Sequence, residues 1–209
     1  KKYGDPENLI YEESESQILD DNSVRIKVES AGVNFADLLI IKGRYQERPR
    51  PPFSPGLEIS GIILEIGQKV SSLKVGDRVM SIMKYGGYKT EVIVPEDNTY
   101  LIPKKMDIIE AGGFPVIYGT AFSAIITKAK LIKNETCIIL GATGGVGMAA
   151  IEIAKAYGAL VVACGGNDEK LKVCVEKGAD YTINYNDKII RKELKSYGIN
   201  EVDVVIDMV

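Results

Sequence analysis

A glycine-rich turn is the stretch of this chain whose residue types and spacing indicate chemistry most directly. Residues 137–147 read CIILGATGGVG, so that Gly141, Gly144 and Gly147 lie three apart after an apolar run. Glycine adopts positive φ and has no side chain to block a phosphate. A helix beginning here would add free backbone N–H groups and the positive end of its dipole. The turn therefore predicts a seat for the pyrophosphate of a dinucleotide.

The end of the next predicted strand bears on which dinucleotide binds. An acidic residue there would bind the ribose 2′-hydroxyl of NAD, but the chain has Gly165-Gly166-Asn167. Asp168 follows and is better explained as a helix cap. Lys170, further on, could meet a 2′-phosphate as a point charge. These residues favour NADP over NAD, although by position alone Lys170 could equally be a solvated helix lysine.

Composition excludes several kinds of chemistry and partner. The 209 residues include no histidine and three cysteines, Cys137, Cys164 and Cys174. His-based triads, general bases and metal ligands are therefore excluded within the chain, and the cysteines lack metal-type spacing, which favours free thiols in a reducing cytoplasm. The net charge of −3, with acids and bases interspersed, argues against a nucleic-acid partner. No apolar run approaches the ~18–20 residues of a membrane-spanning helix.

The elements that must position these residues fall into two groups. Up to about residue 115 the chain predicts short strands, over Val24–Val28, Gly61–Gly67 and Glu91–Pro95, with a loop rich in proline and glycine at residues 49–56. This pattern favours an irregular barrel or sandwich. Helical segments are expected near Asp107 and after Tyr118.

Beyond residue 136 strands and helices alternate. Strands are predicted at 137–140, 160–164, 181–184 and 202–207, with Asn167 or Asp168 capping one of the intervening helices. The helix after the glycine turn has a predicted apolar face formed by Val146, Ala149, Ala150, Ile153, Ala154 and Tyr157. Such alternation predicts a doubly wound parallel sheet. Because a dinucleotide-binding sheet normally has six strands, we expect the chain to be a fragment of a longer protein.

Four motifs in order give a specific resemblance that covers essentially all 209 residues. They are residues 31–37 (AGVNFAD), 55–58 (PGLE), 75–79 (VGDRV) and the glycine turn. The chain resembles the medium-chain dehydrogenase/reductase superfamily, and within it the zinc-independent quinone oxidoreductases of the ζ-crystallin and VAT-1-like branch. The resemblance implies a GroES-like β-rich domain over residues 1–115 and an incomplete Rossmann domain over residues 116–209. The expected fold class is therefore α/β.

The zinc-binding members of this superfamily hold a catalytic zinc with cysteine and histidine. The matching positions here are Asn34, Leu57 and, more approximately, Val116. None suits Zn²⁺, since two of the three side chains have no ligand atom. The cysteine-rich loop of a structural zinc is also absent from the sequence. We therefore expect catalysis without a metal.

Other family roles carry over where residues match. In the family, one segment of the first domain lies along the nicotinamide side of the cofactor, and a threonine at the entry to the nucleotide domain lies near the cofactor. Residues further along the chain form the pyrophosphate turn or contact the 2′-phosphate. In that order, the expected cofactor residues are Phe35, Ala36, Asp37, Thr120, Gly141, Gly144, Gly145, Val146, Gly166, Lys170 and Tyr185. Met208 matches a backbone position under the adenine. The resemblance thus favours Lys170 as a phosphate ligand and NADPH as the cofactor.

The implied reaction transfers hydride from NADPH to a quinone or an enone, and a donor must then stabilise or protonate the carbonyl oxygen. Without zinc the candidates are Tyr45, Asn34 and solvent. Tyr45 equally suits a packing or hydrogen-bonded loop tyrosine, and an asparagine amide could donate to the oxygen but not readily supply a proton. Positioning of donor and acceptor alone could account for a large share of the rate.

Alternative functions remain open at this level. Reduction of an enoyl thioester of the acrylyl-CoA type is a close variant of the same chemistry. A non-enzymatic partner protein that binds NADPH belongs to a different class. The resemblance also implies a homodimer when the protein is full length.

Overall fold

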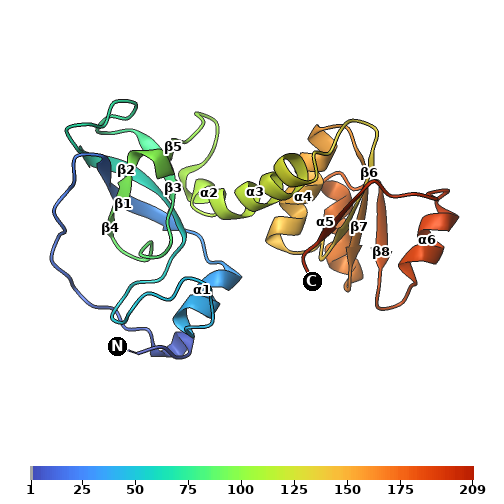
Figure 1. The fold of residues 1–209 in the computed structure, drawn as a ribbon, viewed down its shortest axis with the longest axis horizontal. Coiled ribbons are helices and arrows are strands. Elements are labelled where there is room, and N and C mark those ends of the chain that lie inside the picture. Colours follow the sequence, from blue (N-terminus) through green and yellow to red (C-terminus); the bar gives the residue numbers. More distant parts are fainter. Residues whose placement is uncertain (1) are drawn as a thin grey trace. The chain divides into compact units, whose positions relative to one another are not determined.

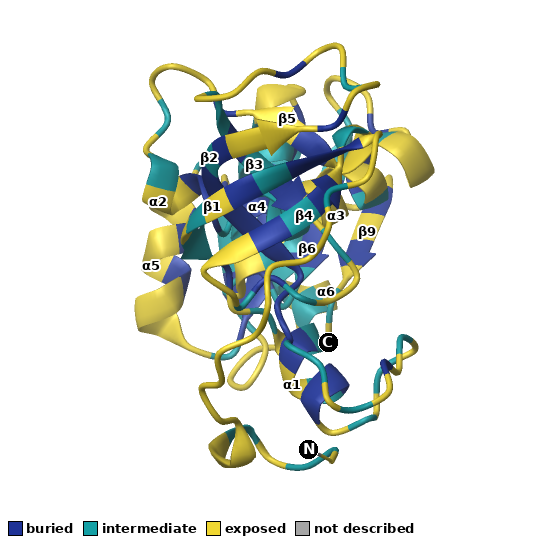
Figure 2. Cartoon of the chain, turned by 90° about the vertical axis from the view of Figure 1, so that its left-hand side faces the viewer, coloured by how far each residue is buried: buried dark blue, intermediate teal, exposed yellow. Residues whose placement is uncertain are grey.

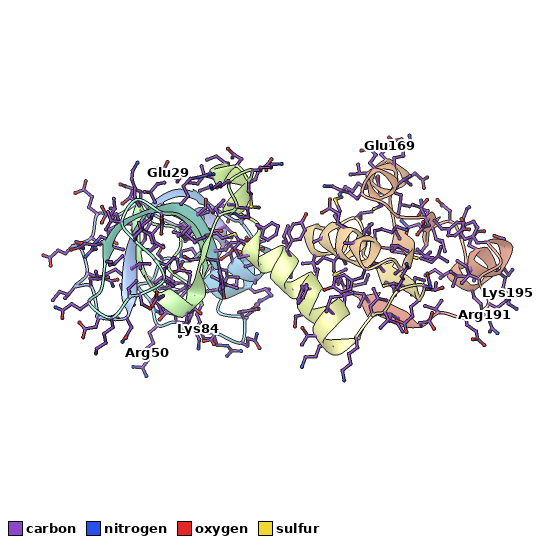
Figure 3. All side chains as sticks on the ribbon, turned by 90° about the horizontal axis from the view of Figure 1, so that it is seen from above. Glu29, Arg50, Lys84, Glu169, Arg191 and Lys195 are labelled. Atoms are coloured by element: carbon purple, nitrogen blue, oxygen red, sulfur yellow. The ribbon has the colours of Figure 1, made fainter. Side chains whose placement is uncertain are left out.

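The computed structural model describes residues 2–209, and the chain divides into two compact units, Lys1–Val116 and Ile117–Val209 (Figure 1). Each unit has its own sheet and its own hydrophobic core. Charged side chains of both signs, including Glu29, Arg50, Glu169 and Arg191, lie exposed on the units (Figure 3). Within the described residues no helix combines the length and apolar character that a membrane crossing would need.

The first unit is built on a five-stranded antiparallel sheet with the order β4-β1-β2-β3-β5. The strands are β1 (Ser23–Ala31), β2 (Glu58–Ile66), β3 (Arg78–Ile82), β4 (Glu91–Pro95) and β5 (Thr99–Leu101). Short helices join or flank them: η1 (Pro6–Asn8), α1 (Phe35–Ile41), η2 (Glu96–Asn98) and α2 (Ile108–Ala111).

The period-two pattern of the first strand explains the core of this unit. Val24 and Ile26 are buried while Lys27 is exposed, and the buried strand residues appear dark blue among exposed yellow ones in Figure 2. We expected Gly61 to stand at the end of a strand, but it lies inside β2. A Cβ there would come within 2.0 Å of the Lys27 carbonyl oxygen, so glycine allows β1 and β2 to approach closely.

The second unit contains a parallel sheet with the order β8-β7-β6-β9. Its strands are β6 (Thr136–Leu140), β7 (Leu160–Gly165), β8 (Tyr181–Asn184) and β9 (Val204–Asp207). Its helices are α3 (Pro115–Phe122), which begins at the end of the first unit, the π-helical segment η3 (Ser123–Lys128), α4 (Gly145–Ala156), α5 (Asp168–Glu176) and α6 (Ile190–Ser196).

Alternate residues of β6 and β7 meet helices on opposite faces of this sheet. Ile139 packs in a cluster with Ala150 of α4 and Leu171 of α5, whereas Ile138 packs with Leu194 of α6. Helices therefore cover both faces, which confirms the predicted α/β fold class with a doubly wound parallel sheet.

Two details of the predicted helices are wrong. The helix expected after Tyr118 begins earlier, at Pro115. In α4 the buried residues are Gly147, Ala149, Ala150, Ile151 and Ala154, whereas Tyr157 is 43% exposed. The other predicted face residues do meet the core, because Ala149, Ala150 and Ala154 are buried and Val146 and Ile153 pack against the cluster.

Candidate functional site

The three glycines of the turn after β6 have different structural roles. Gly141 has φ +69°, a left-handed conformation that glycine adopts without strain. Gly144 is the N-cap of α4, and both Gly144 and Gly145 are exposed. Gly147 is buried, and a Cβ there would come within 2.6 Å of the Ala142 Cα. The turn therefore offers an exposed backbone at the start of a twelve-residue helix, which suits an anion.

The turn lies at the carboxyl edge of the sheet, between β6 and β9. A Cβ on Gly141 would lie 3.4 Å from the carbonyl oxygen of Met208, just beyond β9. From β6 the chain crosses to β7 and then to β8 on one side, and from β8 it returns across the sheet to β9 on the other side of β6. Ligands of open α/β sheets bind outside the strand ends at such a switch point.

The end of β7 lies beside the loop that follows β8. A Cβ on Gly166 would lie 3.2 Å from the Tyr185 ring, and the Asn186 Nδ2 donates to the Gly166 carbonyl oxygen at 2.9 Å. Lys170 is exposed on the first turn of α5 and has no ion pair among residues 2–209. The structure thus brings Gly166 and Tyr185 together, with Lys170 one helical turn away along the chain.

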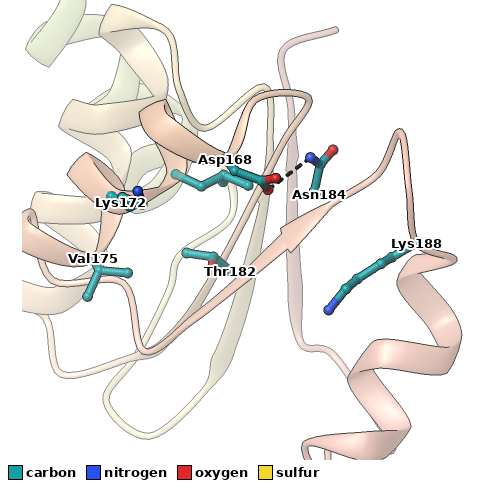
Figure 4. A pocket seen from close by; sticks show the side chains of 7 residues that line it. Asp168, Lys172, Val175, Thr182, Asn184 and Lys188 are labelled. Atoms are coloured by element: carbon teal, nitrogen blue, oxygen red, sulfur yellow. Dashed lines mark hydrogen bonds between the residues drawn. The ribbon is translucent and has the colours of Figure 1, made fainter.

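The residue that caps α5 is Asn167. Its Oδ1 accepts from the Lys170 backbone N–H at 2.9 Å. The expectation that Asp168 caps this helix is therefore wrong. The Asp168 Oδ1 instead accepts from Asn184 Nδ2 at 2.9 Å (Figure 4). Asp168 is thus engaged by Asn184, and Glu169, the next acidic residue after β7, forms an ion pair with Lys172.

A shallow hollow of about 260 Å³ lies between α5 and β8 (Figure 4). It is lined by Asp168, Leu171, Lys172, Val175, Thr182, Asn184 and Lys188. None of the residues predicted to bind the cofactor lines it, so the hollow is separate from the predicted dinucleotide site.

Two other predicted cofactor residues of this unit, Thr120 and Val146, lie on α3 and α4. Thr120 is exposed and Val146 is partly buried at the start of α4. The start of α3 approaches the turn, because a Cβ on Gly145 would lie 3.3 Å from Ile117 Cγ2. No hydrogen bond joins Thr120 to the turn in the described part of the chain.

In the first unit a cluster of buried polar groups surrounds the start of α1. Asp37 and Glu58 are each 1% exposed. The Asp37 carboxylate accepts from the backbone N–H of Asn34 at 2.8 Å, from that of Gly56 at 3.0 Å and from the Tyr88 hydroxyl at 3.1 Å. The Asp37 side chain therefore holds the loop around Asn34, and a contact between its segment and the cofactor stays a prediction.

Glu58 accepts two hydrogen bonds in the same cluster. Asn34 Nδ2 donates to Oε1 at 2.7 Å, and the Val116 backbone N–H donates to Oε2 at 2.8 Å. Burial raises the pKa of Glu58, and the nearby charge of Asp37 raises it further, while the two hydrogen bonds oppose the shift. Burial and the Asp37 charge also raise the pKa of Tyr88, so that its hydroxyl remains a donor.

The other predicted residues of this unit lie apart from the cluster's hydrogen bonds. Phe35 is 75% exposed at the start of α1, and Ala36 beside it is partly buried. Tyr45 is partly buried in the loop after α1, where its carbonyl oxygen accepts from Arg48 Nε at 3.1 Å. Among the described residues its hydroxyl has no hydrogen-bond partner, and none joins it to Asn34.

Glu58 and Tyr88 are the residues that sequence reasoning did not assign. Glu58 lies within one of the four motifs, two residues after a proline-glycine step, where a carboxylate begins a strand rich in apolar residues. That mismatch is a usable signal, because a charged residue in a buried strand requires partners. Tyr88 carries no comparable signal in the sequence.

The two units together define a class of oxidoreductase in which a GroES-like domain precedes a dinucleotide-binding domain. The model of the alcohol dehydrogenase GroES-like domain matches residues 20–104, and that of the zinc-binding dehydrogenase matches residues 145–209. The chain belongs to the medium-chain dehydrogenase/reductase superfamily, which confirms the resemblance seen in the sequence.

Relatives and solved structures agree with this assignment. The chain is 39% identical over 203 residues to quinone oxidoreductase-like protein 2 of Bos taurus, covering 96% of this chain and 58% of the relative. It is 36% identical over 210 residues to quinone oxidoreductase of Sus scrofa, covering 99% and 64%. The chain thus spans about three fifths of the length of these relatives.

Two crystal structures are similar over nearly the whole chain. Escherichia coli quinone oxidoreductase in complex with NADPH has a TM-score of 0.87 and 28% identity, covering 99% of this chain and 64% of that one. CurK enoyl reductase has a TM-score of 0.89 and 27% identity, covering 100% and 65%.

The zinc ion implied by the matching domain model does not fit the residues of this chain. Two of the three positions that match zinc ligands, Asn34 and Val116, instead direct N–H groups at the Glu58 carboxylate, and the third, Leu57, is a buried apolar side chain. Zn²⁺ is bound by Cys, His, Asp or Glu side chains, and none of these stands at the three positions. Among residues 2–209 no group of three or more Cys, Asp or Glu side chains is placed to hold a metal ion.

Proposed function

We propose that the protein is a zinc-independent oxidoreductase that uses NADPH to reduce a quinone or an α,β-unsaturated carbonyl. NADPH would supply the hydride. The observation that carries the proposal is the exposed glycine turn at the switch point of the sheet, combined with an unpaired Lys170 and no free acidic side chain at the end of β7.

The second unit supplies the groups that would hold the cofactor. The exposed backbone of Gly144 and Gly145 and the positive end of the α4 dipole would meet the pyrophosphate. Lys170 would pair with the 2′-phosphate. Tyr185, which is 38% exposed beside Gly166, would contact the same phosphate through its hydroxyl.

The first unit supplies the candidate donors to the reacting oxygen. Asn34 has one amide N–H that is not used by Glu58, and Tyr45 has an unpaired hydroxyl. Either group could stabilise the negative charge that develops on a carbonyl oxygen, which is the task that zinc performs in other members of the superfamily. Phe35, exposed at the start of α1, would pack along the nicotinamide.

The proposal is tested by incubating the full-length protein with NADPH or NADH and a panel of quinones and enones, and following absorbance at the reduced-nicotinamide band. We expect acceptor-dependent oxidation of NADPH that exceeds oxidation of NADH. No oxidation above the blank with any acceptor would refute an enzymatic role. Tight NADPH binding without turnover would then support the alternative, a non-enzymatic NADPH-binding partner protein.

Reduction of an enoyl thioester is the second candidate, because CurK enoyl reductase is among the similar structures. Crotonyl-CoA and acrylyl-CoA in the same panel separate the two reactions. A kcat/KM for the thioesters well above that for free quinones would favour this candidate.

We also propose a cytoplasmic location and a homodimer for the full-length protein. The three cysteines are buried and unpaired, which suits a reducing compartment. Light scattering after size-exclusion chromatography would determine the oligomeric state, and a monomeric mass at micromolar concentration would refute the dimer.

A further inference from the structure

The Glu58 carboxylate is held by two donors that come from different parts of the first unit. Asn34 precedes α1 and donates from its side chain, while Val116 donates from the backbone near the start of α3. Each carboxylate oxygen therefore has one short hydrogen bond, and Glu58 is 1% exposed. A carboxylate satisfies this pair of donors, because both of its oxygens accept.

The Asn34 amide is held by Glu58 at the N-cap of α1. Its nitrogen donates to Glu58, and its oxygen lies on the side of the capping box that begins α1, where the Asp37 backbone N–H donates to the Asn34 carbonyl oxygen at 3.0 Å. Gly32 packs against Glu58 so tightly that a Cβ there would lie 2.2 Å from Oε1. The carboxylate thus has no room to move away, and one N–H of the amide is left without a partner among residues 2–209.

We propose that Glu58 is a positioning residue that fixes the orientation of the Asn34 amide, so that its remaining N–H serves as a fixed hydrogen-bond donor to the carbonyl oxygen of the bound acceptor. The target of this donor rests on the proposed function. The orientation itself does not, because it follows from the hydrogen bonds of Glu58.

A glutamine at position 58 could not replace the carboxylate. Its single oxygen would accept either from Val116 or from Asn34, and its NH₂ group would then face the other donor. The backbone N–H of Val116 cannot rotate, whereas the Asn34 amide can. We therefore expect the Glu58→Gln variant to turn the Asn34 amide around, which would direct its oxygen at the new glutamine.

Two further variants test this arrangement: one replaces the Asn34 amide with a carboxylate, and the other exchanges the amide at position 34 and the carboxylate at position 58. Asn34→Asp alone places a second carboxylate against Glu58, and this repulsion adds to that of Asp37. The double variant Asn34→Asp, Glu58→Gln removes the repulsion, because the new glutamine can accept from Val116 and donate to the new aspartate. Aspartate is also a good N-cap for α1. The double variant therefore restores the hydrogen bonds but carries no N–H donor at position 34.

The experiment measures kcat, KM, NADPH affinity and thermal unfolding for the full-length wild type, both single variants, the double variant and Glu65→Gln. Glu65 lies on the same strand, is exposed and pairs with Arg25, so its variant is the control for a glutamate on β2. We expect Glu58→Gln to lower kcat roughly tenfold or more, with NADPH affinity changed less than about twofold. The double variant should regain the unfolding temperature but not kcat.

Recovery of kcat in the double variant would overturn the proposal, because it would show that only capping matters. Side-chain amide NMR signals decide the orientation without any turnover. The two NMR signals of the Asn34 side-chain NH₂ group are assigned by their loss in Asn34→Asp. In Glu58→Gln their chemical shifts should change, and their protons should exchange faster with solvent. An unchanged pair would overturn the positioning role even in an active enzyme. If the wild type oxidises no NADPH but the pair responds, the proposed function fails while the positioning of Asn34 by Glu58 stands.

Discussion

In the second unit the groups offered to a ligand are backbone N–H groups at an exposed turn, whereas in the first unit the polar groups are side chains buried at the start of α1. Gly144 and Gly145 are open to solvent, while Asp37 and Glu58 are each 1% exposed. Binding and positioning therefore place opposite demands on burial. A turn that receives a phosphate must be accessible, but a carboxylate that orients an amide is most effective when water cannot compete.

Among the substitutions considered, we expect the largest loss of stability at Asp37, in the buried cluster of the first unit. Asp37→Ala would leave the N–H groups of Asn34 and Gly56 and the Tyr88 hydroxyl without their acceptor. We expect a loss of roughly 3 kcal/mol or more in the free energy of unfolding. Urea titration checks this value. Asp21→Ala is the control, since Asp21 forms only an exposed ion pair with Lys69, and it should change stability by less than about 1 kcal/mol. Similar losses in both variants would contradict the special role of the buried cluster.

The second prediction separates two glycines of the turn. Gly147→Ala forces a Cβ against the backbone of Gly141 and Ala142 at 2.6 Å, and we expect it to cost about 1–3 kcal/mol of stability. Gly144→Ala meets its nearest atom at 3.6 Å, so it should leave stability nearly unchanged and weaken NADPH binding instead. Thermal unfolding and a fluorescence titration with NADPH measure the two effects. Equal stability of the two variants would refute the division of roles.

A smaller effect is expected at Lys170. Lys170→Ala should weaken NADPH binding about tenfold and leave NADH binding unchanged, because the side chain would serve only the 2′-phosphate. Lys172→Ala is the matched control, two residues along α5, where the lysine pairs with Glu169. Titration of each variant with both cofactors tests this. If NADH binding weakens as much as NADPH binding, Lys170 is not a 2′-phosphate ligand.

The smallest effect is expected at Tyr45. Tyr45→Phe should lower kcat by a few-fold and leave NADPH affinity intact if the hydroxyl donates to the reacting oxygen, since a neutral hydrogen bond contributes about 1 kcal/mol. Steady-state kinetics and cofactor titration separate the two quantities. Unchanged kcat would assign Tyr45 to packing and leave Asn34 as the donor of the first unit.

The sequence predicted the second unit better than the first, for physical reasons. A glycine turn between a strand and a helix is a local pattern, because the backbone conformation and the helix start depend on adjacent residues. The edge strand Glu91–Pro95 was likewise predicted with its observed bounds, since proline can end a strand at the edge of a sheet. The α/β class and the parallel sheet followed from the alternation of elements.

The buried cluster could not be read in the same way. Asp37 and Glu58 are 21 positions apart, and Tyr88 and Val116 are further along the chain, so nothing local indicates that they meet. The apolar face of α4 was predicted correctly except at its end. Helical spacing placed Tyr157 on that face, but Tyr157 lies after the last residue of α4 and is 43% exposed.

The tight contact at Gly147 also has a consequence for the entropy of ligand binding. Because the first turn of α4 rests directly on the backbone of Gly141 and Ala142, the loop between them is already ordered in the protein alone. Little conformational freedom would be lost when an anion arrives, and preorganisation of this kind increases affinity without adding a single contact. A buried position that never meets the ligand would thus contribute to the strength with which the ligand is held.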